Sequence, residues 1–351
     1  MTEENLKRLI DELRVLPSET ECMQFETDFA IKDVDEIEAI NKLDYPAYFK
    51  LTRQPLPENR TGILERLEQE RFIQKASLGR YHITNLGAIL FAYDLNSFDT
   101  LSRKVIRVIF YKANDRLETI KEHRGKNGYA AGFNTLIEYI TERLPSHEEI
   151  IGAFRQEIKM FPEIAVRELV ANALIHQDFT IRGAGPMVEI FADRIEISNP
   201  GSPLIDTLRF IDHLPRSRNE KLTDFMRRIN ICEERGSGID KVINSIELLQ
   251  SPAPNFIANE NFLKVILYGP KPLQLMDKYD KIRACYQHCS LKFVVGDYMT
   301  NTSLRERFNM QEENYRTASK IIADTIAEGL IKIYGPGLKS KKFAKYIPFW
   351  A

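Results

Sequence analysis

These 351 residues contain few cysteines and no long apolar run, the features that mark disulfide-rich and membrane-spanning proteins. There are four cysteines, too few for a disulfide framework at this length, which predicts a protein of the reducing cytoplasm. No run approaches the roughly 20 consecutive apolar residues that span a bilayer. The acidic opening MTEENLKRLIDEL is also unlike a secretory signal. The sequence therefore predicts no membrane partner.

A strong net charge and a phosphate-binding P-loop are also missing. The 49 basic and 50 acidic residues leave a formal net charge of −1, so no global field attracts nucleic acid or a membrane. The pattern GxxxxGK[ST] does not occur, which excludes a P-loop NTPase. No internal repeat or low-complexity segment is present. A chain of this length can form two or three domains with cores of their own.

The stretch Phe161–His176, FPEIAVRELVANALIH, is the most informative part of the sequence. Pro162 suits a first helical turn, and the apolar residues that follow recur with the helical period. Glu168, Asn172 and His176 are spaced by four and form a polar stripe along the edge of this apolar face. A glutamate can take a proton from water, and an amide oxygen suits Mg²⁺. The alternative is an ordinary amphipathic helix whose polar edge faces solvent.

Two glycine-containing turns follow this helix. Residues 188–197 alternate as a β-hairpin does, and the second strand runs into Asn199-Pro200-Gly201. Farther on, Gly236-Ser237-Gly238 precedes a predicted helix at residues 240–249. The N–H groups at the start of such a helix can receive phosphate. Each turn is weak evidence alone, but the ordered set points to a nucleotide site.

The segments RELVANALIHQDF, DRIEISNPG, PRSRNE and ERGSGIDKV occur in this order. Together they resemble the GHKL-type ATPase domain of a prokaryotic family labelled RecG-like, or ATP-binding transcriptional regulator. The resemblance is close over Ile150–Leu267. It implies an α+β chain whose ATPase domain is an α/β sandwich, a mostly antiparallel sheet with helices on one face. Helical or winged-helix domains would lie on either side.

The resemblance also implies roles for individual residues, with ATP and Mg²⁺ as cofactors. Glu168 would be the general base, and Asn172 the Mg²⁺ ligand that bridges the phosphates. Asn199 stands where many GHKL proteins have an aspartate that reads the adenine amino group. The expected nucleotide contacts are Asn199 and Gly201 on the adenine side, and Gly236, Ser237 and Gly238 at the phosphates.

The segment Asp206–Ile231 would correspond to the mobile lid of such a domain. Arg216 and Arg218 belong to its PRSRNE run and are the candidates to reach the γ-phosphate as the lid closes. The alternative is that both are ordinary surface charges.

The regions on either side of the ATPase-like part are predicted separately. Larger family members carry an AlbA/Schlafen-like domain near the N-terminus, which looks deleted here. Glu19, Glu21, Glu26 and Asp28 are interpreted as a solvated acidic loop rather than a metal cluster. Helices are expected at 59–71, 85–92 and 129–143, a small wing at 72–83 and a strand at 104–111. The expected divisions are a remnant at 1–40, a helical, winged-helix-like and strand region at 41–149, the ATP-binding domain at 150–268, a linker at 269–280 and a winged helix at 281–351.

The C-terminal winged helix is predicted from three helices and two strands. The helices are expected at 281–293, 301–308 and 312–328, and the strands at 330–334 and 344–348. Lys339, Lys341 and Lys342 lie at the tip of the wing, where they would contact double-stranded DNA. The alternative is a packing or dimerisation domain of the same fold. Cys285, His288 and Cys289 lack a second ligand pair with zinc spacing, so a metal site is not expected there.

Two functions remain open at this point. The first is an ATP-responsive transcriptional regulator, in which the ATPase-like domain controls the DNA-binding winged helix. The second is a slow Mg²⁺-dependent ATPase subunit of a defence or repair complex, with the winged helix contacting protein. Whether ATP is hydrolysed or only held, and whether the chain forms a homodimer, are open in both. A degenerate domain without nucleotide is disfavoured because Glu168 and Asn172 occur together.

Overall fold

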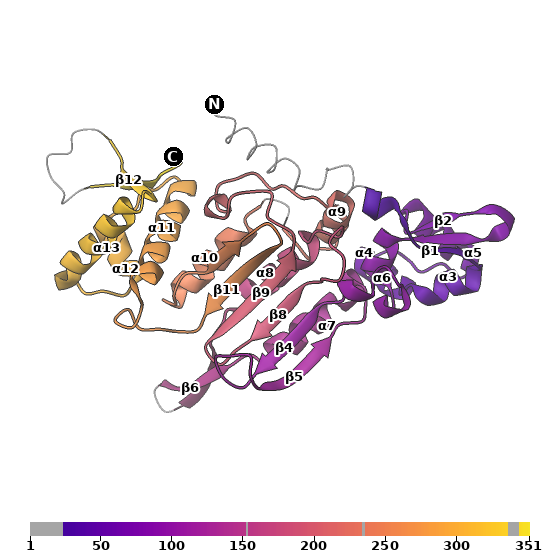
Figure 1. Ribbon diagram of the computed structural model, residues 1–351, viewed down its shortest axis with the longest axis horizontal. Coiled ribbons are helices and arrows are strands. Elements are labelled where there is room, and N and C mark those ends of the chain that lie inside the picture. The colour runs from indigo at the N-terminus through magenta and orange to yellow at the C-terminus, as the bar shows by residue number, and fades with distance from the viewer. Residues whose placement is uncertain (1–23, 152–153, 234–235, 336–343) are drawn as a thin grey trace, which may run out of the picture.

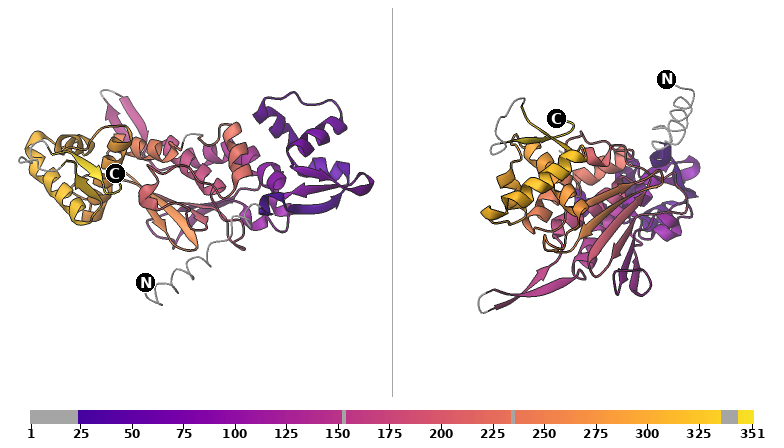
Figure 2. Two further views of the ribbon diagram at one scale, coloured as in Figure 1. Left: turned by 90° about the horizontal axis from the view of Figure 1, so that it is seen from above. Right: turned by 60° about the vertical axis from the view of Figure 1, so that its left-hand side comes forward.

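The computed structural model describes residues 24–151, 154–233, 236–335 and 344–351. Three groups of elements follow one another along the long axis of the molecule (Figures 1 and 2). We call them the N-terminal module (residues 24–101), the central domain (102–268) and the C-terminal module (278–351). Helices and strands occur in all three, which confirms the predicted α+β class. No helix in the described ranges is long and apolar enough to cross a membrane.

The N-terminal module contains a three-stranded antiparallel sheet in the order β1 (Phe29–Val34), β3 (Tyr81–Thr84), β2 (Ile73–Lys75). Helix α6 (Asn85–Phe91) is buried along its whole length because its residues, NLGAILF, are small or apolar except for Asn85. The predicted helices at 59–71 and 85–92 and the small wing between them are confirmed. The other helices of the module are α3 (Glu36–Lys42), α4 (Tyr45–Thr52) and α5 (Arg60–Gln69).

The central domain is built on a six-stranded sheet in the order β10-β11-β9-β8-β4-β5. All neighbouring strands are antiparallel except β4 and β8, which are parallel. The predicted hairpin at 188–197 is confirmed, and the strand predicted at 104–111 is β4, which begins at Arg107. The strand bounds are β4 (Arg107–Tyr111), β5 (Thr119–Arg124), β8 (Met187–Ile190), β9 (Arg194–Pro200), β10 (Asn255–Ala258) and β11 (Phe262–Tyr268).

Strands β4 and β5 precede residue 150 in the chain, yet they belong to this central sheet. Residue 150 itself lies in a separate two-stranded hairpin, β6 (Ser146–Ile151) and β7 (Phe154–Lys159). The hairpin projects away from the body of the molecule (Figure 2). One strand of the parallel pair, β4, and the edge strand β5 therefore come from a part of the chain that lies outside the closest family resemblance.

Three helices cover one face of the sheet: α7 (Tyr129–Thr141), α8 (Glu163–Ile175) and α10 (Gly238–Leu248). Helix α8 lies between the other two and packs on β9 (Figure 1). Its predicted apolar face is confirmed, because Ala165, Val166, Leu169, Val170, Ala173 and Leu174 are all buried. The mostly antiparallel sheet with helices on one face is the sandwich that was predicted.

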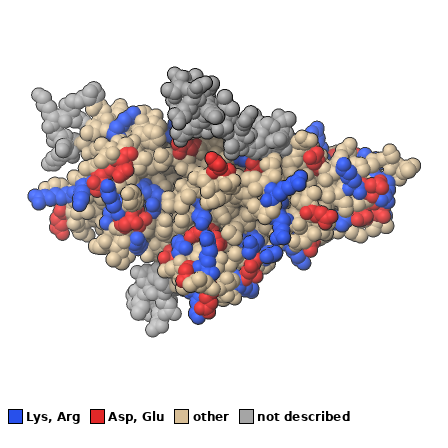
Figure 3. Space-filling view, viewed as in Figure 1, with Lys and Arg blue, Asp and Glu red and all other residues tan. Residues whose placement is uncertain are grey.

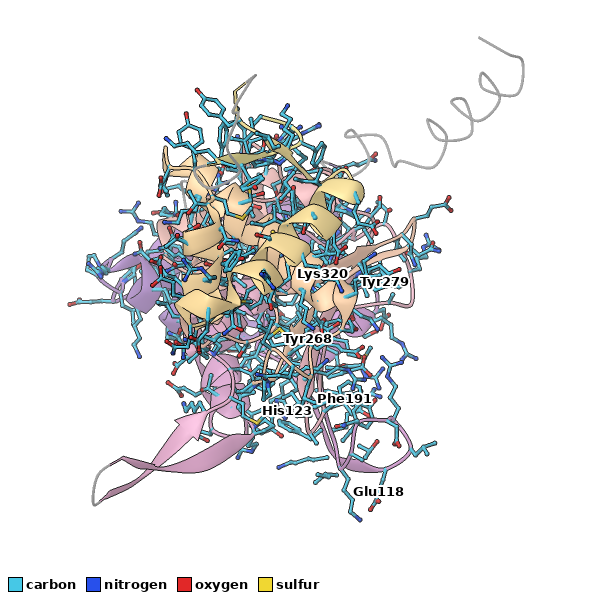
Figure 4. The ribbon with its side chains drawn as sticks, turned by 90° about the vertical axis from the view of Figure 1, so that its left-hand side faces the viewer. Glu118, His123, Phe191, Tyr268, Tyr279 and Lys320 are labelled. Atoms are coloured by element: carbon cyan, nitrogen blue, oxygen red, sulfur yellow. The ribbon has the colours of Figure 1, made fainter. Side chains whose placement is uncertain are left out.

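Long charged side chains cover the other face of the sheet. The carboxylates of Glu189 and Glu196 are almost fully buried there, and Arg116 ion-pairs with both, at 2.7 and 3.1 Å. Arg194 pairs with Glu196 at 2.8 Å and stacks on Phe191, which is labelled in Figure 4. Buried carboxylates are tolerated because each is paired. Elsewhere, positive and negative side chains are interspersed on the face seen in Figure 3.

The C-terminal module has the predicted order of three helices and two strands. A separate apolar core holds it together, in which Cys285, Cys289 and Met299 are fully buried. Met276 joins this core, although it lies in the expected linker at 269–280. The expected DNA contacts Lys339, Lys341 and Lys342 lie outside the described residues. The elements are α11 (Lys278–Val294), α12 (Asn301–Arg307), α13 (Tyr315–Ala327), β12 (Ile331–Ile333) and β13 (Tyr346–Pro348).

The prediction of a solvated acidic loop is wrong for Glu26, which is 3% exposed. Its carboxylate accepts the backbone N–H groups of Leu222 at 2.8 Å and Lys221 at 3.3 Å, in the first turn of α9 (Glu220–Arg228). The first N–H groups of a helix lack partners within the helix, so a carboxylate can satisfy them. Glu19 and Glu21 lie outside the described residues.

Helix α9 also packs into the N-terminal module. The Phe225 ring lies 5.3 Å from that of Phe72, 5.4 Å from Phe91 and 6.3 Å from Tyr48, measured between ring centroids. These aromatic rings are all buried, and burying such rings is among the largest apolar contributions to stability. The N-terminal module is therefore fixed to the helix that follows residues 202–218.

Candidate functional site

One cavity in the central domain lies between α8, strands β9 and β11, residues 202–218 and the start of α10. We call residues 202–218 the lid segment, because the rest of the lid expected at Asp206–Ile231 contains α9, which packs into the N-terminal module. The cavity volume is about 160 Å³, below the roughly 300–1,000 Å³ of typical ligand pockets. The lid segment contributes a large part of the wall, so a larger ligand would have to displace it. The expected site residues that line the cavity are Glu168, Asn172, Asn199, Arg216, Arg218, Gly236 and Gly238.

Glu168 and Gly238 are in direct contact where α8 and α10 meet. A Cβ atom at position 238 would lie only 2.0 Å from Oε1 of Glu168. Glycine is therefore the residue that lets α10 begin against this carboxylate. The Asn172 side chain, one turn farther along α8, hydrogen-bonds to the same carboxylate. Glu168, Asn172 and Gly238, which are expected as general base, Mg²⁺ ligand and phosphate contact, thus lie side by side.

The environment of Glu168 favours its neutral form. Burial raises the pKa of the carboxyl group, and the nearby carboxylate of Glu233 raises it further. Lys241, Arg167 and the hydrogen bond from Asn172 act in the opposite direction. A base with a raised pKa holds an abstracted proton more firmly than an ordinary surface carboxylate, which suits proton transfer near neutral pH.

The glycine turn at the start of α10 touches both α8 and the lid segment. Gly236 has φ +72°, which favours glycine, and a Cβ there would lie 2.6 Å from Cγ of Pro215 in the lid segment. The Ser237 hydroxyl donates to Oε2 of Glu233 at 3.2 Å, and Ser237 is not among the residues that line the cavity. The side chain of Ser237, the N-cap residue of α10, makes no capping hydrogen bond, so the first N–H groups of this helix keep the capacity to bind an anion.

The adenine side of the expected site has a polar end and apolar walls. Asn199 is 5% exposed and its side-chain nitrogen donates to the carbonyl of Pro200 at 3.3 Å. The apolar walls, which the sequence interpretation did not identify, come from both sheet and lid: Ile197, Leu204, Ile205, Phe210, Phe256, Leu263 and Val265. The alternation of apolar residues along the strands could have indicated these walls. Ile197 and Val265 are paired across β9 and β11 and lie on the face of the sheet that the helices cover.

A buried ion pair fixes both ends of the lid segment. Arg218 donates to Oδ2 of Asp178 at 2.7 Å and to the backbone carbonyl of Ser202. Asp178 also accepts the hydroxyl of Thr180 at 2.6 Å. Gly201 does not line the cavity. Its φ of +97° favours glycine, and a Cβ atom there would lie 2.6 Å from Cβ of Asp178, so glycine leaves room for this aspartate. Both partners are almost fully buried, so removing either one would leave an uncompensated charge.

The polar stripe of α8 ends in a neutral histidine. His176 lines the cavity, and burial lowers its pKa to about 4, with Arg218 and Arg227 contributing in the same direction. At neutral pH its imidazole therefore carries no charge and can both donate and accept one hydrogen bond. The stripe of Glu168, Asn172 and His176 faces a cavity rather than bulk solvent.

A second, more polar cavity of about 580 Å³ lies on the other side of Glu168. It shares Glu168, Arg227, Cys232 and Glu233 with the first cavity. Four cationic side chains line it: Arg167, Arg227, Arg228 and Lys241. Glu168, Asp224 and Glu233 line it as well, so side chains of both charges lie beside the end of the site at which the phosphates are expected.

The donor set around Asn172 fits Mg²⁺ that is held jointly with nucleotide phosphates. Mg²⁺ commonly takes one or two protein oxygens and completes its shell with phosphate and water. Asn172 offers one amide oxygen and Glu168 a carboxylate beside it. Within the described ranges there is no group of three or more His, Cys, Asp or Glu side chains that could hold a metal without a nucleotide.

Residues 183–267 match a family model described as "Putative ATP-dependent DNA helicase recG C-terminal". We call this part of the chain the RecG-type domain, because it is similar to the C-terminal ATPase domain of that family. The matched residues include the lid segment, α10 and four strands of the sheet, whereas Glu168 and Asn172 precede the match. Neither regulation of transcription nor binding of DNA follows from it.

The fold of the RecG-type domain and its surroundings is similar to that of a protein whose structure has been solved. This is the crystal structure of the DIP2311 protein from Corynebacterium diphtheriae, with 16% sequence identity and a TM-score of 0.54. The similarity covers 80% of this chain and 57% of that chain, so this chain spans little more than half of its relative. At this identity the likeness concerns the fold alone. No functionally curated protein has a significantly similar sequence.

Proposed function

We propose that the RecG-type domain binds Mg-ATP in the cavity beneath the lid segment and thereby controls the C-terminal winged helix on double-stranded DNA. The supporting observation is that the expected site residues come together in the structure. Glu168 and Asn172 of α8 meet the Gly236–Gly238 turn around one cavity, although these elements are far apart in the chain. The order of the motifs along the sequence does not require such a meeting.

Each part of the cavity has a distinct role in this proposal. The apolar walls between β9, β11 and the lid hold the adenine ring of ATP, and Asn199 lies at the polar edge of that ring. The first N–H groups of α10 and the oxygen of Asn172 face the phosphates and Mg²⁺. When bound, Mg²⁺ supplies positive charge that neutralises the phosphate oxygens. Glu168 accepts a proton from water if ATP is hydrolysed.

The two lid arginines take different roles. Arg218 is committed to Asp178 and Ser202, so we assign it to holding the lid segment in place. Arg216 lies on the exposed part of the lid and lines the cavity, and we assign the phosphate contact to it. The cavity is too small for a nucleotide in this conformation, so binding requires the lid to move.

The DNA contact in this proposal comes from the C-terminal module. Arg316 and Lys320 are exposed on α13, and Figure 4 shows Lys320 at the outer end of the molecule. Together with Lys339, Lys341 and Lys342 they would contact phosphates. Glu312 and Glu313 are exposed directly before α13 and would repel DNA. This observation favours the second candidate, a slow Mg²⁺-dependent ATPase subunit whose winged helix contacts a protein or another copy of the chain.

Titration of the protein with ATP, with and without Mg²⁺, tests the nucleotide part. Asn172→Ala should abolish Mg²⁺-dependent binding, because Asn172 provides the amide oxygen at this position. Asn244→Ala, at an exposed position on α10, is the matched control and should bind as the parent does. Equal affinity of Asn172→Ala and the parent would refute the Mg²⁺ assignment, and no binding by the parent would refute the proposed function.

A further inference from the structure

The lid segment is in direct contact with the C-terminal module. Tyr286 of α11 is 3% exposed, and its hydroxyl donates to the backbone carbonyl of Leu208 in the lid. The same hydroxyl accepts the indole N–H of Trp350 at 3.1 Å. Both hydrogen-bonding capacities of this phenol are therefore used, one of them on the lid.

Trp350 makes a second connection to the lid. The guanidinium carbon of Arg209 lies 5.2 Å from the centroid of the Trp350 ring, within the range of a cation–π interaction. Arg209 is oriented by Asp212, whose carboxylate accepts its Nε–H at 2.8 Å. The ring of Phe293 packs edge-on against Trp350 at 5.4 Å. Trp350 thus lies between α11 and Arg209 of the lid segment.

The opposite end of the nucleotide site is connected to the same module through α10. This helix begins at Gly238, against Glu168, and Glu247 lies in its last turn. The Glu247 carboxylate lies 3.1 Å from Nδ1 of His288 and 3.4 Å from Nε of Arg307. The Arg307 side chain is fully buried in this contact. The C-terminal module is therefore seated on a helix whose first turn forms the expected phosphate site.

We propose that Tyr286 and Trp350 form a latch that holds the lid segment in the position in which the cavity is small. Nucleotide binding is then coupled to the contacts between the C-terminal module and the central domain. The proposal rests on the proposed function, because the cavity must enlarge to admit ATP. Enlarging it moves the segment that carries Leu208 and Arg209. A ligand shifts such an equilibrium only through its different affinities for the two states. The coupling is reciprocal, so release of the latch should favour nucleotide binding.

Tyr286→Phe is the direct test because it removes one hydroxyl and keeps the ring. A buried hydrogen bond contributes roughly 0.5–1.5 kcal/mol, so release of the lid should tighten Mg-ATP binding by about 2- to 13-fold. Hydrogen exchange of residues 202–218 should also become faster in the nucleotide-free protein. Tyr279→Phe is the matched control, since Tyr279 lies on the same helix but is 68% exposed (Figure 4).

Trp350→Phe provides a second variant, which loses the indole N–H and weakens the contact with Arg209. It should act in the same direction as Tyr286→Phe, and the double variant should gain less than the sum of the two effects. In the parent, Mg-ATP should speed hydrogen exchange of the C-terminal peptide that contains Trp350. A merely structural role would leave this nucleotide response intact in Tyr286→Phe.

The outcomes separate the latch from the nucleotide proposal. Faster lid exchange in Tyr286→Phe supports the latch even if the parent binds no ATP, which would refute the proposed function alone. Unchanged lid exchange together with unchanged Mg-ATP affinity would overturn the latch while leaving ATP binding in place. Equal effects of Tyr279→Phe and Tyr286→Phe would also overturn it.

Discussion

The contact between Gly238 and Glu168 leads to a quantitative prediction for Gly238→Ala. The new Cβ would lie 2.0 Å from Oε1 and 2.5 Å from Cδ of Glu168, whereas contacts below 3.0 Å are essentially never observed for a Cβ atom. The carboxylate must therefore retreat by about 1 Å, a displacement that can cost on the order of 10²-fold in rate. Alanine forms helices better than glycine by about 1 kcal/mol, so the stability of α10 should not fall.

The assay is single-turnover hydrolysis of Mg-ATP together with a binding titration. Gly238→Ala should bind Mg-ATP with little change and hydrolyse it about 10²-fold more slowly than the parent. Ser237→Ala is the control in the same turn, because it loses only the hydroxyl that donates to Glu233. Its hydrolysis rate should stay close to that of the parent.

A combination of variants shows whether Gly238 acts through Glu168. Glu168→Gln should spare binding and slow hydrolysis by roughly 10²–10⁴-fold. If Gly238→Ala acts by displacing this carboxylate, adding it to Glu168→Gln should cause little further loss. A parental hydrolysis rate in Gly238→Ala, or an equal additional loss in the Glu168→Gln background, would refute this reasoning.

Two further predictions concern the pH dependence and the wing. Because burial and Glu233 raise the pKa of Glu168, the rate of hydrolysis should increase with pH through an inflection above the ordinary carboxyl range. Glu233→Gln should move that inflection to lower pH, since it removes one cause of the raised pKa. An unmoved inflection would contradict the role of Glu168 as base. Replacing Lys339, Lys341 and Lys342 by Ala should lower the log–log salt slope of DNA binding by roughly 2–3. All DNA sequences should weaken alike, and an unchanged slope, or no DNA binding by the parent, would favour a protein-contacting winged helix.

The elements with a strong local period were predictable from the sequence. The apolar arc of α8, the alternation in β8 and β9 and the order of elements in the C-terminal module all agree with the structure. Such patterns depend on residues only a few positions apart, so no knowledge of the fold is needed to detect them. The exposed strand β5 and the hairpin of β6 and β7 lacked such a signal and were not predicted.

Glu26 illustrates a residue whose environment could not be read locally. Its acidic neighbours in the sequence predict a solvated loop, yet its carboxylate caps α9, 195 residues or more away in the chain. Burial raises the pKa of Glu26, and the two backbone N–H bonds act against that rise. A cap of this kind depends on where two distant elements meet, which composition does not encode.

The sequence by itself determined which chemical groups are available and in what order: Glu168 and Asn172 on one helical edge, then two glycine turns. Only the tertiary structure decided which of these groups touch. It places Gly238 against Glu168, turns Arg218 toward Asp178, and sets Tyr286 on the lid. The physical reason is that periodicity acts within one element, whereas these contacts depend on strand order and helix packing, which join residues far apart in the chain.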